Sequence, residues 1–194
     1  MDRSTIQLRS VPSQFEAREA DDGYYIEGYF AVFGQDYEMF PGASESIAPG
    51  AFSKTLGGDI RALINHETRL VVGRTKVGTL KLNEDSHGLW GSIRINPKDT
   101  DAMNCRERVL RGDVDQCSIG FEIVDEETEF REDGSVHWTI RDVILHEVSV
   151  CTFPAYEQTS ISARAKQYEE IRKRKVDERK AHLLRRLKGE KNGT

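Results

Sequence analysis

Residues 116–123 read Q-C-S-I-G-F-E-I, an apolar run with a serine near its start. Apolar and aromatic residues dominate the run, which predicts a β-strand, and Gly120 leaves room beside the hydroxyl of Ser118. A serine hydroxyl is protonated at neutral pH, so it becomes a nucleophile only beside a base, and that base needs an orienting group. If Ser118 is a nucleophile, other parts of the chain must therefore supply a base, such as a histidine, and a group that orients it, such as a carboxylate.

Histidines occur at two further apolar runs. His66 follows residues 63–65, and residues 144–150 contain the pair His146-Glu147. A carboxylate inside an apolar strand is costly unless it has a partner, and carboxylates commonly orient catalytic imidazoles. Adjacent strand residues point to opposite faces, so only one of the pair can face His66. We favour Glu147 as that partner, because a buried carboxylate needs a partner more than a histidine does, and His146 is the alternative.

Each of these residues also has a more ordinary interpretation. A lone Ser118 is most often a strand serine bonded to a neighbour, and a lone His66 is most often a partly buried structural histidine. Cys117 should point away from the face that bears Ser118, which places it in the core. A metal hydrolase site built from His66, His146 and either Cys117 or Cys151 is disfavoured, because no pair has the short spacing of zinc ligands.

The composition indicates a soluble protein with one domain of substantial size. The chain has 194 residues, of which 37% are hydrophobic and 31% charged. It has no apolar run near the ~20 residues that span a bilayer, and residues 1–20 lack the apolar core of a signal peptide. The three cysteines are an odd number without CxxC spacing, which argues against a disulfide framework and a zinc ribbon. We therefore expect a cytoplasmic protein without a membrane partner, cofactor or metal.

The charge is distributed unevenly along the chain. Residues 164–194 carry 12 Lys and Arg against 5 Asp and Glu, whereas residues 1–163 carry 16 against 28. This asymmetry predicts a body at 1–163 and a basic, helical or disordered C-terminal tail at 164–194. Acidic residues are interspersed in the tail and Tyr168 is its one aromatic residue, so a solvated helix is favoured over an arm that binds a specific nucleic acid.

Hydrophobic periodicity and turn signals predict a mainly β protein with some helix, of the α+β class. The residues up to about 22 are expected to be a loose leader or an edge strand, and residues 34–50 a connection. A helix is expected from about residue 99 to Gly112, with one or two helical turns at 51–56. The predicted strands are 24–33, 60–65, 71–82, 89–95, 116–124 and 136–150. Their spacing suggests an antiparallel sheet that curls toward a barrel.

Three segments in the same order resemble a known family. Residues 63–66, 114–121 and 145–156 are similar to the tailed-bacteriophage prohead proteases, the capsid-maturation serine proteases whose fold is related to that of the herpesvirus assemblins. Residues 28–33 and 49–52 also resemble the usual opening of this family. The resemblance extends from about residue 24 to residue 163.

The resemblance implies an assemblin-like antiparallel β-barrel flanked by helices. By motif, Ser118 corresponds to the nucleophile and His66 to the general base. Glu147 occupies the third position, where the herpesvirus relatives use a second histidine. Residues 152–156 correspond to the backbone that stabilises the oxyanion; because a proline has no N–H, Ala155 or Tyr156 would donate.

The function implied by this resemblance is limited proteolysis inside the procapsid, in the host cytoplasm. The enzyme would cut scaffolding segments from the major capsid protein, and also cut itself. Its expected partners are the major capsid protein and its scaffolding segment, with self-association as a further possibility. The alternative is a non-catalytic capsid scaffold or assembly protein that keeps the barrel without the chemistry.

Overall fold

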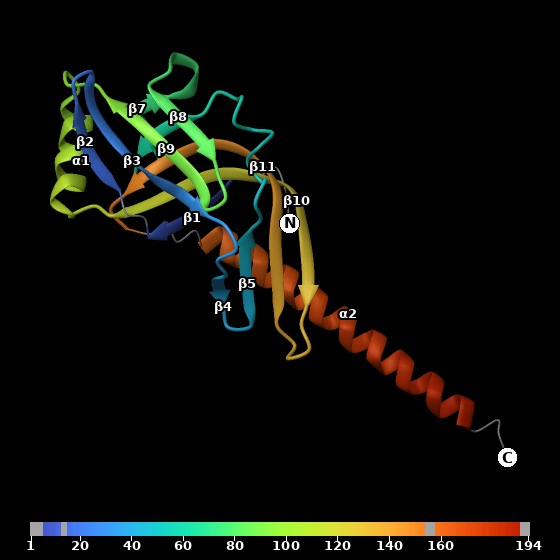
Figure 1. Ribbon diagram of the computed structural model, residues 1–194. Helices are drawn as coiled ribbons and strands as arrows, with labels where there is room; N and C mark the ends of the chain where they lie inside the picture. Colours follow the sequence, from blue (N-terminus) through green and yellow to red (C-terminus); the bar gives the residue numbers. More distant parts are fainter. Residues whose placement is uncertain (1–5, 13–14, 154–157, 191–194) are drawn as a thin grey trace.

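The computed structural model describes residues 6–12, 15–153 and 158–190. In this part of the chain the strands form two sheets, accompanied by two α-helices and a 3-10 turn (Figure 1). The seven-stranded sheet consists of β1 (Gln7–Pro12), β4 (Tyr37–Phe40), β5 (Ala43–Ile47), β6 (Arg61–Ile64), β7 (Glu67–Arg74), β10 (Gln116–Phe130) and β11 (Val136–Cys151). The four-stranded sheet consists of β2 (Glu16–Ala20), β3 (Gly23–Val32), β8 (Leu80–Glu84) and β9 (Gly88–Ile95). The helical elements are α1 (Thr100–Arg111), α2 (Gln158–Glu190) and the 3-10 turn η1 (Thr75–Val77).

The mixed α+β class predicted from the sequence is confirmed, but the structure has no closed antiparallel barrel in its described part. The long strand β11 is the reason. It pairs antiparallel with β10 along one side, while along the other its first half pairs in parallel with β5 and its second half with β6. The expected connection at 34–50 thus supplies β4 and β5, which extend the sheet rather than close it.

A second departure from the sequence prediction concerns the strand expected at 71–82. The chain leaves β7 in the 3-10 turn η1 and then passes through Gly78, whose φ of 74° lies in the left-handed region. Glycine adopts this conformation without the steric cost of a Cβ atom. The turn moves the chain from the seven-stranded sheet to β8 in the four-stranded sheet, so one predicted strand becomes two. The helical turns predicted at 51–56 are hydrogen-bonded turns rather than an α-helix.

Helix α1 begins and ends at the residues that the sequence indicated. The Asp99 carboxylate caps its N-terminus by accepting from the backbone N–H groups of Asp101 (3.0 Å) and Ala102 (3.1 Å). Gly112, with φ of 80°, ends the helix in the left-handed conformation typical of C-terminal caps. The helix buries one face that includes Cys105 and Val109, and this face packs against the main core.

The main core lies between the two sheets. Ile26 and Ile93 come from the four-stranded sheet, and they belong to one buried cluster with Ile119 and Val148 of the seven-stranded sheet. Burial of such side chains stabilises each by about 1.5–3 kcal/mol. The cluster packs against one face of β10 and β11. The opposite face of these two strands is therefore held in a fixed position, where it can carry a functional site.

Helix α2 is anchored to the body at its N-terminal half and extends away from it (Figure 1). Ile171 packs with Ala43, Val136 and Trp138 in a second, smaller core. Arg164 is fully buried, stacks on the ring of Trp138 at 4.6 Å and pairs with two carboxylates.

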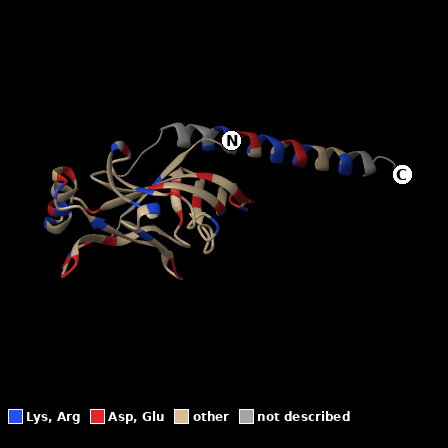
Figure 2. Cartoon of the chain, turned by 90° about the horizontal axis from the view of Figure 1, so that it is seen from above, with Lys and Arg blue, Asp and Glu red and all other residues tan. Residues whose placement is uncertain are grey.

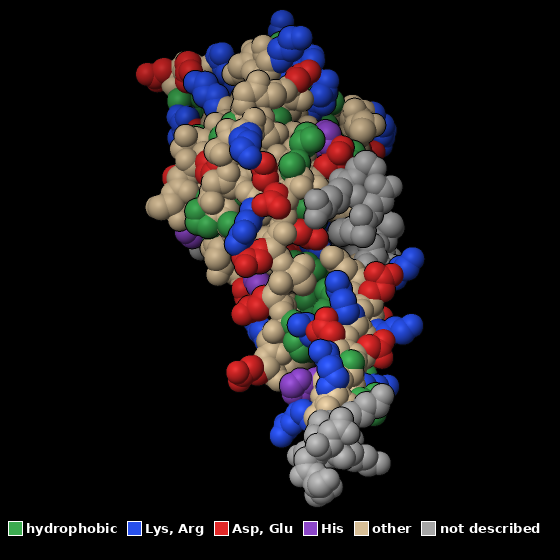
Figure 3. All heavy atoms as spheres, turned by 90° about the vertical axis from the view of Figure 1, so that its right-hand side faces the viewer, with side chains coloured by type: hydrophobic (Ala, Val, Ile, Leu, Met, Phe, Trp, Pro, Cys, Tyr) green, Lys and Arg blue, Asp and Glu red, His purple; other side chains and the backbone are tan. Residues whose placement is uncertain are grey.

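Basic and acidic residues are interspersed along α2 (Figures 2 and 3). Farther along the helix Val176, Leu183 and Leu184 are exposed. No helix among the described residues is both long enough and apolar enough to cross a membrane. The predicted division into a body at 1–163 and a tail at 164–194 stays a prediction.

Candidate active site

His66 lies in a tight turn that directly follows β6. Both Asn65 (φ 52°) and His66 (φ 61°) adopt the left-handed conformation, which costs a non-glycine residue about 1–2 kcal/mol. Bonds to the end of β11 hold this turn in place. The Asn65 N–H donates to Val150 O (3.0 Å), and the Asn65 side-chain oxygen accepts from the Thr152 N–H (2.9 Å). The strained turn directs His66 back over β11. This placement of the imidazole explains why a residue other than glycine keeps the left-handed conformation here.

The imidazole of His66 is oriented by a carboxylate. Its Nδ1 atom lies 2.7 Å from Glu147 Oε1. The other carboxylate oxygen, Oε2, accepts a hydrogen bond from Ser149 Oγ at 2.6 Å, and Ser149 Oγ in turn accepts from the backbone N–H of His66 at 3.2 Å. With Glu147 ionised, Nδ1 carries the proton and Nε2 is the free base. The three residues therefore form a closed ring of contacts that fixes the imidazole tautomer.

The candidate nucleophile shares a sheet face with this carboxylate. In the register of β10 and β11, Ser118 lies opposite Ser149 and Gly120 lies opposite Glu147. Residues directly opposite each other, and residues two apart along a strand, point to the same face. Ser118 is thus on the same sheet face as Glu147 and Ser149. Neighbouring strands lie about 4.8 Å apart, so Ser118 is one strand away from the β11 residues that contact His66.

The hydroxyl of Ser118 is bonded to a group other than the imidazole. Its side chain is fully buried, and its hydroxyl donates to the backbone carbonyl of Arg9 in β1 at 3.0 Å. No hydrogen bond joins it to His66 within the described residues. The Nε2 atom of His66 instead faces Cys151 Sγ at 3.7 Å. The candidate base and its carboxylate are in contact, whereas the hydroxyl of Ser118 is bonded to another partner.

Gly120 provides the space that Glu147 occupies. A Cβ atom at position 120 would lie 2.3 Å from Glu147 Oε1, far inside van der Waals contact. The sequence predicts this space beside the hydroxyl of Ser118. The structure shows that it also admits the carboxylate that orients His66, so any larger residue would displace that carboxylate.

Cys151 is the thiol nearest to the candidate base. It is buried, and burial together with the nearby charge of Glu147 raises the pKa of its thiol to about 12. The thiolate is the reactive form of cysteine. Because a group with this pKa is almost entirely protonated at neutral pH, the contact with His66 does not make Cys151 a nucleophile.

The remaining candidates from the sequence lie elsewhere. His146 points away from His66, and its Nε2 atom lies 2.8 Å from Glu122 Oε1. Cys117 is fully buried on the core side, where its thiol donates to the Tyr29 carbonyl at 3.1 Å. Within the described ranges, no group of three His, Cys, Asp or Glu residues could hold a metal ion.

A pocket of about 370 Å³ opens beside the imidazole. It is lined by the turn residues Asn65 and His66 and by Cys151, Thr152 and Phe153 at the end of β11. The pocket is open to solvent beside the candidate base. The predicted oxyanion donors, Ala155 and Tyr156, follow this segment but lie outside the described residues.

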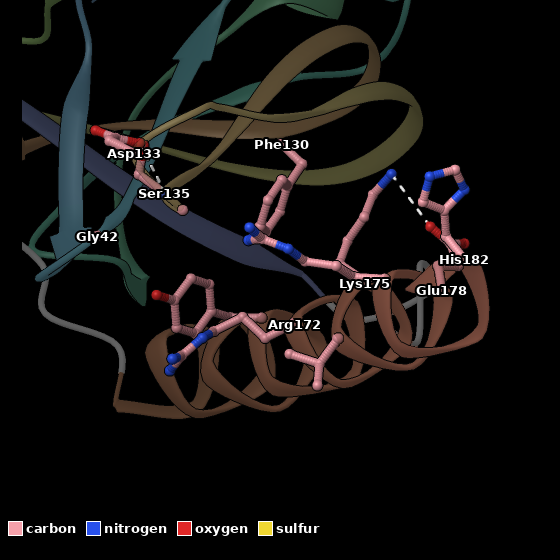
Figure 4. Close-up of a pocket in the computed structure, with 12 residues that line it drawn as sticks. Gly42, Phe130, Asp133, Ser135, Arg172, Lys175, Glu178 and His182 are labelled. Carbon is pink, nitrogen blue, oxygen red and sulfur yellow. Dashed lines mark hydrogen bonds and ion pairs between the residues drawn. The ribbon is translucent and has the colours of Figure 1, made fainter. Parts of the chain in front are cut away.

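A larger pocket of about 770 Å³ lies between α2 and the hairpin that connects β10 and β11 (Figure 4). It contains Asp133, Ser135 and His182, which are the residue types of a catalytic triad. However, Ser135 Oγ donates to Asp133 at 2.7 Å, and His182 lies apart from both, near Lys175 and Glu178 (Figure 4). This pocket therefore has no assembled base and nucleophile.

Two residues of the site, Ser149 and Arg9, are not predicted from the sequence. Ser149 could have been found, because a residue two positions after Glu147 on a strand must share its face. Arg9 could not have been found, since its carbonyl reaches Ser118 only through the pairing of β1 with β10, which joins residues 109 positions apart.

The sequence matches that of a known protein family. The family model of the caudovirus prohead serine proteases matches residues 13–174. The prohead protease of Enterobacteria phage HK97 is 32% identical over 142 residues, which cover 71% of this chain and 59% of that protein. The chain therefore spans about three fifths of the length of this relative. The solved structure of the bacteriophage T4 capsid assembly protease is similar with a TM-score of 0.49 and 9% identity, over 76% of this chain and 97% of that one. From the family match and the HK97 relative, we conclude that the chain belongs to the caudovirus prohead serine protease family.

Proposed function

We propose that the protein is a serine endopeptidase of phage capsid maturation. In this proposal Ser118 is the nucleophile, His66 the general base and Glu147 the group that orients the base. The observation that carries the proposal is the contact of 2.7 Å between His66 Nδ1 and Glu147 Oε1, on the sheet face that also bears Ser118. Membership of the prohead serine protease family supports it independently.

The chemistry follows from the positions of these groups. Glu147 accepts from Nδ1 and so keeps Nε2 unprotonated, which allows Nε2 to take the proton of the Ser118 hydroxyl as the oxygen attacks a peptide carbonyl carbon. The imidazolium that forms is stabilised by the adjacent carboxylate. It then gives its proton to the leaving amine, and water hydrolyses the acyl-enzyme by the same route in reverse. Backbone N–H groups of Ala155 or Tyr156 would stabilise the oxyanion.

The substrate we propose is the scaffolding segment of the major capsid protein, together with segments of the protease itself. The family description and the name of the HK97 relative, a prohead protease, support this choice. The reaction would take place inside the procapsid, in the host cytoplasm.

Co-expression with the major capsid protein tests the proposal. Wild-type protein, Ser118→Ala and Ser135→Ala would each be produced with the capsid protein, and the products identified by mass spectrometry. Ser135 is a matched control, because it is a serine of the distant hairpin turn. We expect cleaved capsid protein with wild type and Ser135→Ala, and intact capsid protein with Ser118→Ala.

The second candidate is a capsid scaffold or assembly protein without catalytic activity. The observation that favours it is the full burial of Ser118, whose hydroxyl is bonded to Arg9 rather than to His66. Cleavage of the capsid protein by the Ser118→Ala variant, or its absence with wild type, would make this candidate the better account.

A further inference from the structure

A fully buried hydroxyl cannot attack a substrate, so some part of the structure must move before Ser118 reacts. Three strands define its surroundings, because β10 carries Ser118, β11 lies on one side and β1 on the other. Strand β11 is central, since it also pairs with β5 and β6. Strand β1 ends the row of strands in the described part of the sheet, so it can leave β10 without breaking any other pair of that sheet.

Strand β1 lies against Ser118 as a bound peptide would. It is extended and antiparallel to β10, with Ser10 directly opposite Ser118. An extended peptide that adds to a sheet edge binds by this main-chain pairing and is selected through its side chains. The carbonyl of Arg9 accepts from Ser118 Oγ at 3.0 Å, so the main chain of β1 lies directly against the candidate nucleophile.

The contact is not productive. A seryl hydroxyl has one proton to donate, and here that proton goes to the Arg9 carbonyl oxygen rather than to the imidazole. The Nε2 atom of His66 faces Cys151 instead. The same strand therefore covers the nucleophile and also takes the proton that the base must receive.

The side chain of Arg9 is held by a buried carboxylate, that of Glu45. Its guanidinium makes two bonds to Glu45, from Nε to Oε1 at 2.5 Å and from Nη2 to Oε2 at 3.2 Å, and it lies 5.9 Å from the ring centroid of Phe121. Glu45 also accepts from the buried Arg164 of α2. Burial raises the pKa of Glu45, but the charges of Arg9 and Arg164 outweigh it and leave the pKa below its usual value. The Glu45 carboxylate thus binds the cationic side chain of β1 in a buried, bidentate contact.

We propose that β1 is an internal pseudosubstrate: it occupies the edge of β10 that an extended peptide substrate uses, with Arg9 in the place of a basic substrate residue recognised by Glu45. This inference rests on the proposed function, because it takes Ser118 as the nucleophile. It adds a substrate class, namely extended segments with Arg or Lys at this position, and it explains how the enzyme stays inactive until β1 leaves.

The rate at which Ser118 reacts with diisopropyl fluorophosphate tests the proposal. In that reaction Ser118 Oγ forms a bond to phosphorus, fluoride leaves, and the hydroxyl proton passes to His66. Wild type, Arg9→Ala, Arg9→Lys and Arg18→Ala would be compared as full chains, with the modified residue identified by mass spectrometry. Arg18 is the matched control, since it is a strand arginine that also binds a carboxylate with two nitrogens, but on the surface.

We expect Arg9→Ala to react about tenfold faster than wild type or more, because loss of one partner of a buried ion pair weakens the docking of β1. Arg9→Lys should lie closer to wild type, and Arg18→Ala should match it. In the Arg9→Ala variant, a synthetic peptide with the sequence of residues 6–12 should slow the reaction, and the same peptide with glutamate in place of the arginine should not. Equal rates for Arg9→Ala and wild type, with the modification on Ser118, would overturn the inference while leaving the proposed function intact.

Wild-type protein provides a second measurement if Arg9→Ala fails to fold. After partial reaction, hydrogen exchange of the modified molecules should show loss of amide protection in β1 with protection of β11 retained. Modified molecules in which β1 keeps its protection would overturn the inference. Modification of a residue other than Ser118, or of none, would overturn the proposed function and the inference together.

Discussion

His66 Nδ1 lies 2.7 Å from Glu147 Oε1, while the Nε2 atom on the opposite side of the ring faces the end of β11. A neutral Glu147→Gln side chain can present its N–H₂ group to Nδ1, which would move the imidazole proton to Nε2 and remove the base. We expect kcat to fall by about 10²- to 10⁴-fold with little change in KM. Glu122→Gln is the matched control, because it removes the carboxylate that binds His146, and it should keep near wild-type activity. An equal loss in both variants would contradict the assignment of Glu147.

Ser149 positions both partners of this pair, since it donates to Glu147 Oε2 and accepts from the backbone N–H of His66. Ser149→Ala should lower kcat by about tenfold, the value of one hydrogen bond of about 1 kcal/mol or slightly more. Ser149→Thr keeps the hydroxyl and should restore most of the loss. A pH profile of kcat should show a changed apparent pKa in Ser149→Ala only. Identical profiles for all three proteins would show that Ser149 has no positioning role.

Gly120→Ala should abolish activity although it adds only one methyl group. The new Cβ atom would lie 2.3 Å from Glu147 Oε1, so the carboxylate must leave its position beside the imidazole. We expect a loss of stability of about 1–3 kcal/mol, measured by urea denaturation, in addition to the loss of kcat. Gly57→Ala is a suitable control, since no atom lies within 4 Å of a Cβ atom built there. A fully active Gly120→Ala protein would contradict this placement of Glu147.

Cys151 should be dispensable for catalysis despite its contact with His66. The pKa of its thiol is raised to about 12 by burial and by the charge of Glu147, so the thiolate is rare at neutral pH. We expect Cys151→Ala to keep activity within about threefold of wild type, and iodoacetamide to leave native wild-type protein active. Loss of activity in Cys151→Ala, with circular dichroism unchanged, would indicate that the thiol takes part in the reaction.

The buried ion pairs of Glu45 should make stability depend on pH in the acid range. Burial raises the pKa of Glu45, but Arg9 and Arg164 lower it by more than burial raises it. The net pKa therefore lies below the ordinary value of 4.5. Its stabilising contribution is therefore fully present above pH 4.5 and is lost as the pH falls through the lower pKa of the folded state. Thermal unfolding between pH 3 and pH 7 should show a steeper fall of Tm below pH 4.5 for wild type than for Glu45→Gln. Parallel curves for the two proteins would contradict this ion-pair energetics.

The sequence indicated much of the fold because local signals are strong at particular residues. Asp99 and Gly112 define the ends of α1, and the apolar runs predicted β3, β9 and β11 close to their bounds. The strand predicted at 116–124 begins where β10 begins, but β10 continues to Phe130. The closed barrel was wrong, since closure depends on which strands pair with β11 over long distances in the chain. Residues 34–50 contain enough turn signals to look like a loop, and β5 forms a strand through its pairing with β4 and with the distant β11.

Part of the candidate site could also be predicted, because a local sequence signal is strong there as well. A carboxylate within the apolar strand at 144–150 required a partner, which directed attention to His66, and the two side chains are in contact in the structure. The burial of Ser118 and its bond to Arg9 could not be predicted from the sequence, because both depend on the pairing of β1 with β10. No local pattern encodes a contact of this kind.

Mapping the covalent adduct of a serine-directed inhibitor tests the central claim most directly. Full-length wild type, Ser118→Ala and His66→Ala would be treated with diisopropyl fluorophosphate, digested and sequenced by mass spectrometry. The account predicts one adduct, on residue 118 of the wild type, with none in either variant. An adduct on Ser149 or Cys151, or one that still forms in Ser118→Ala, would contradict it.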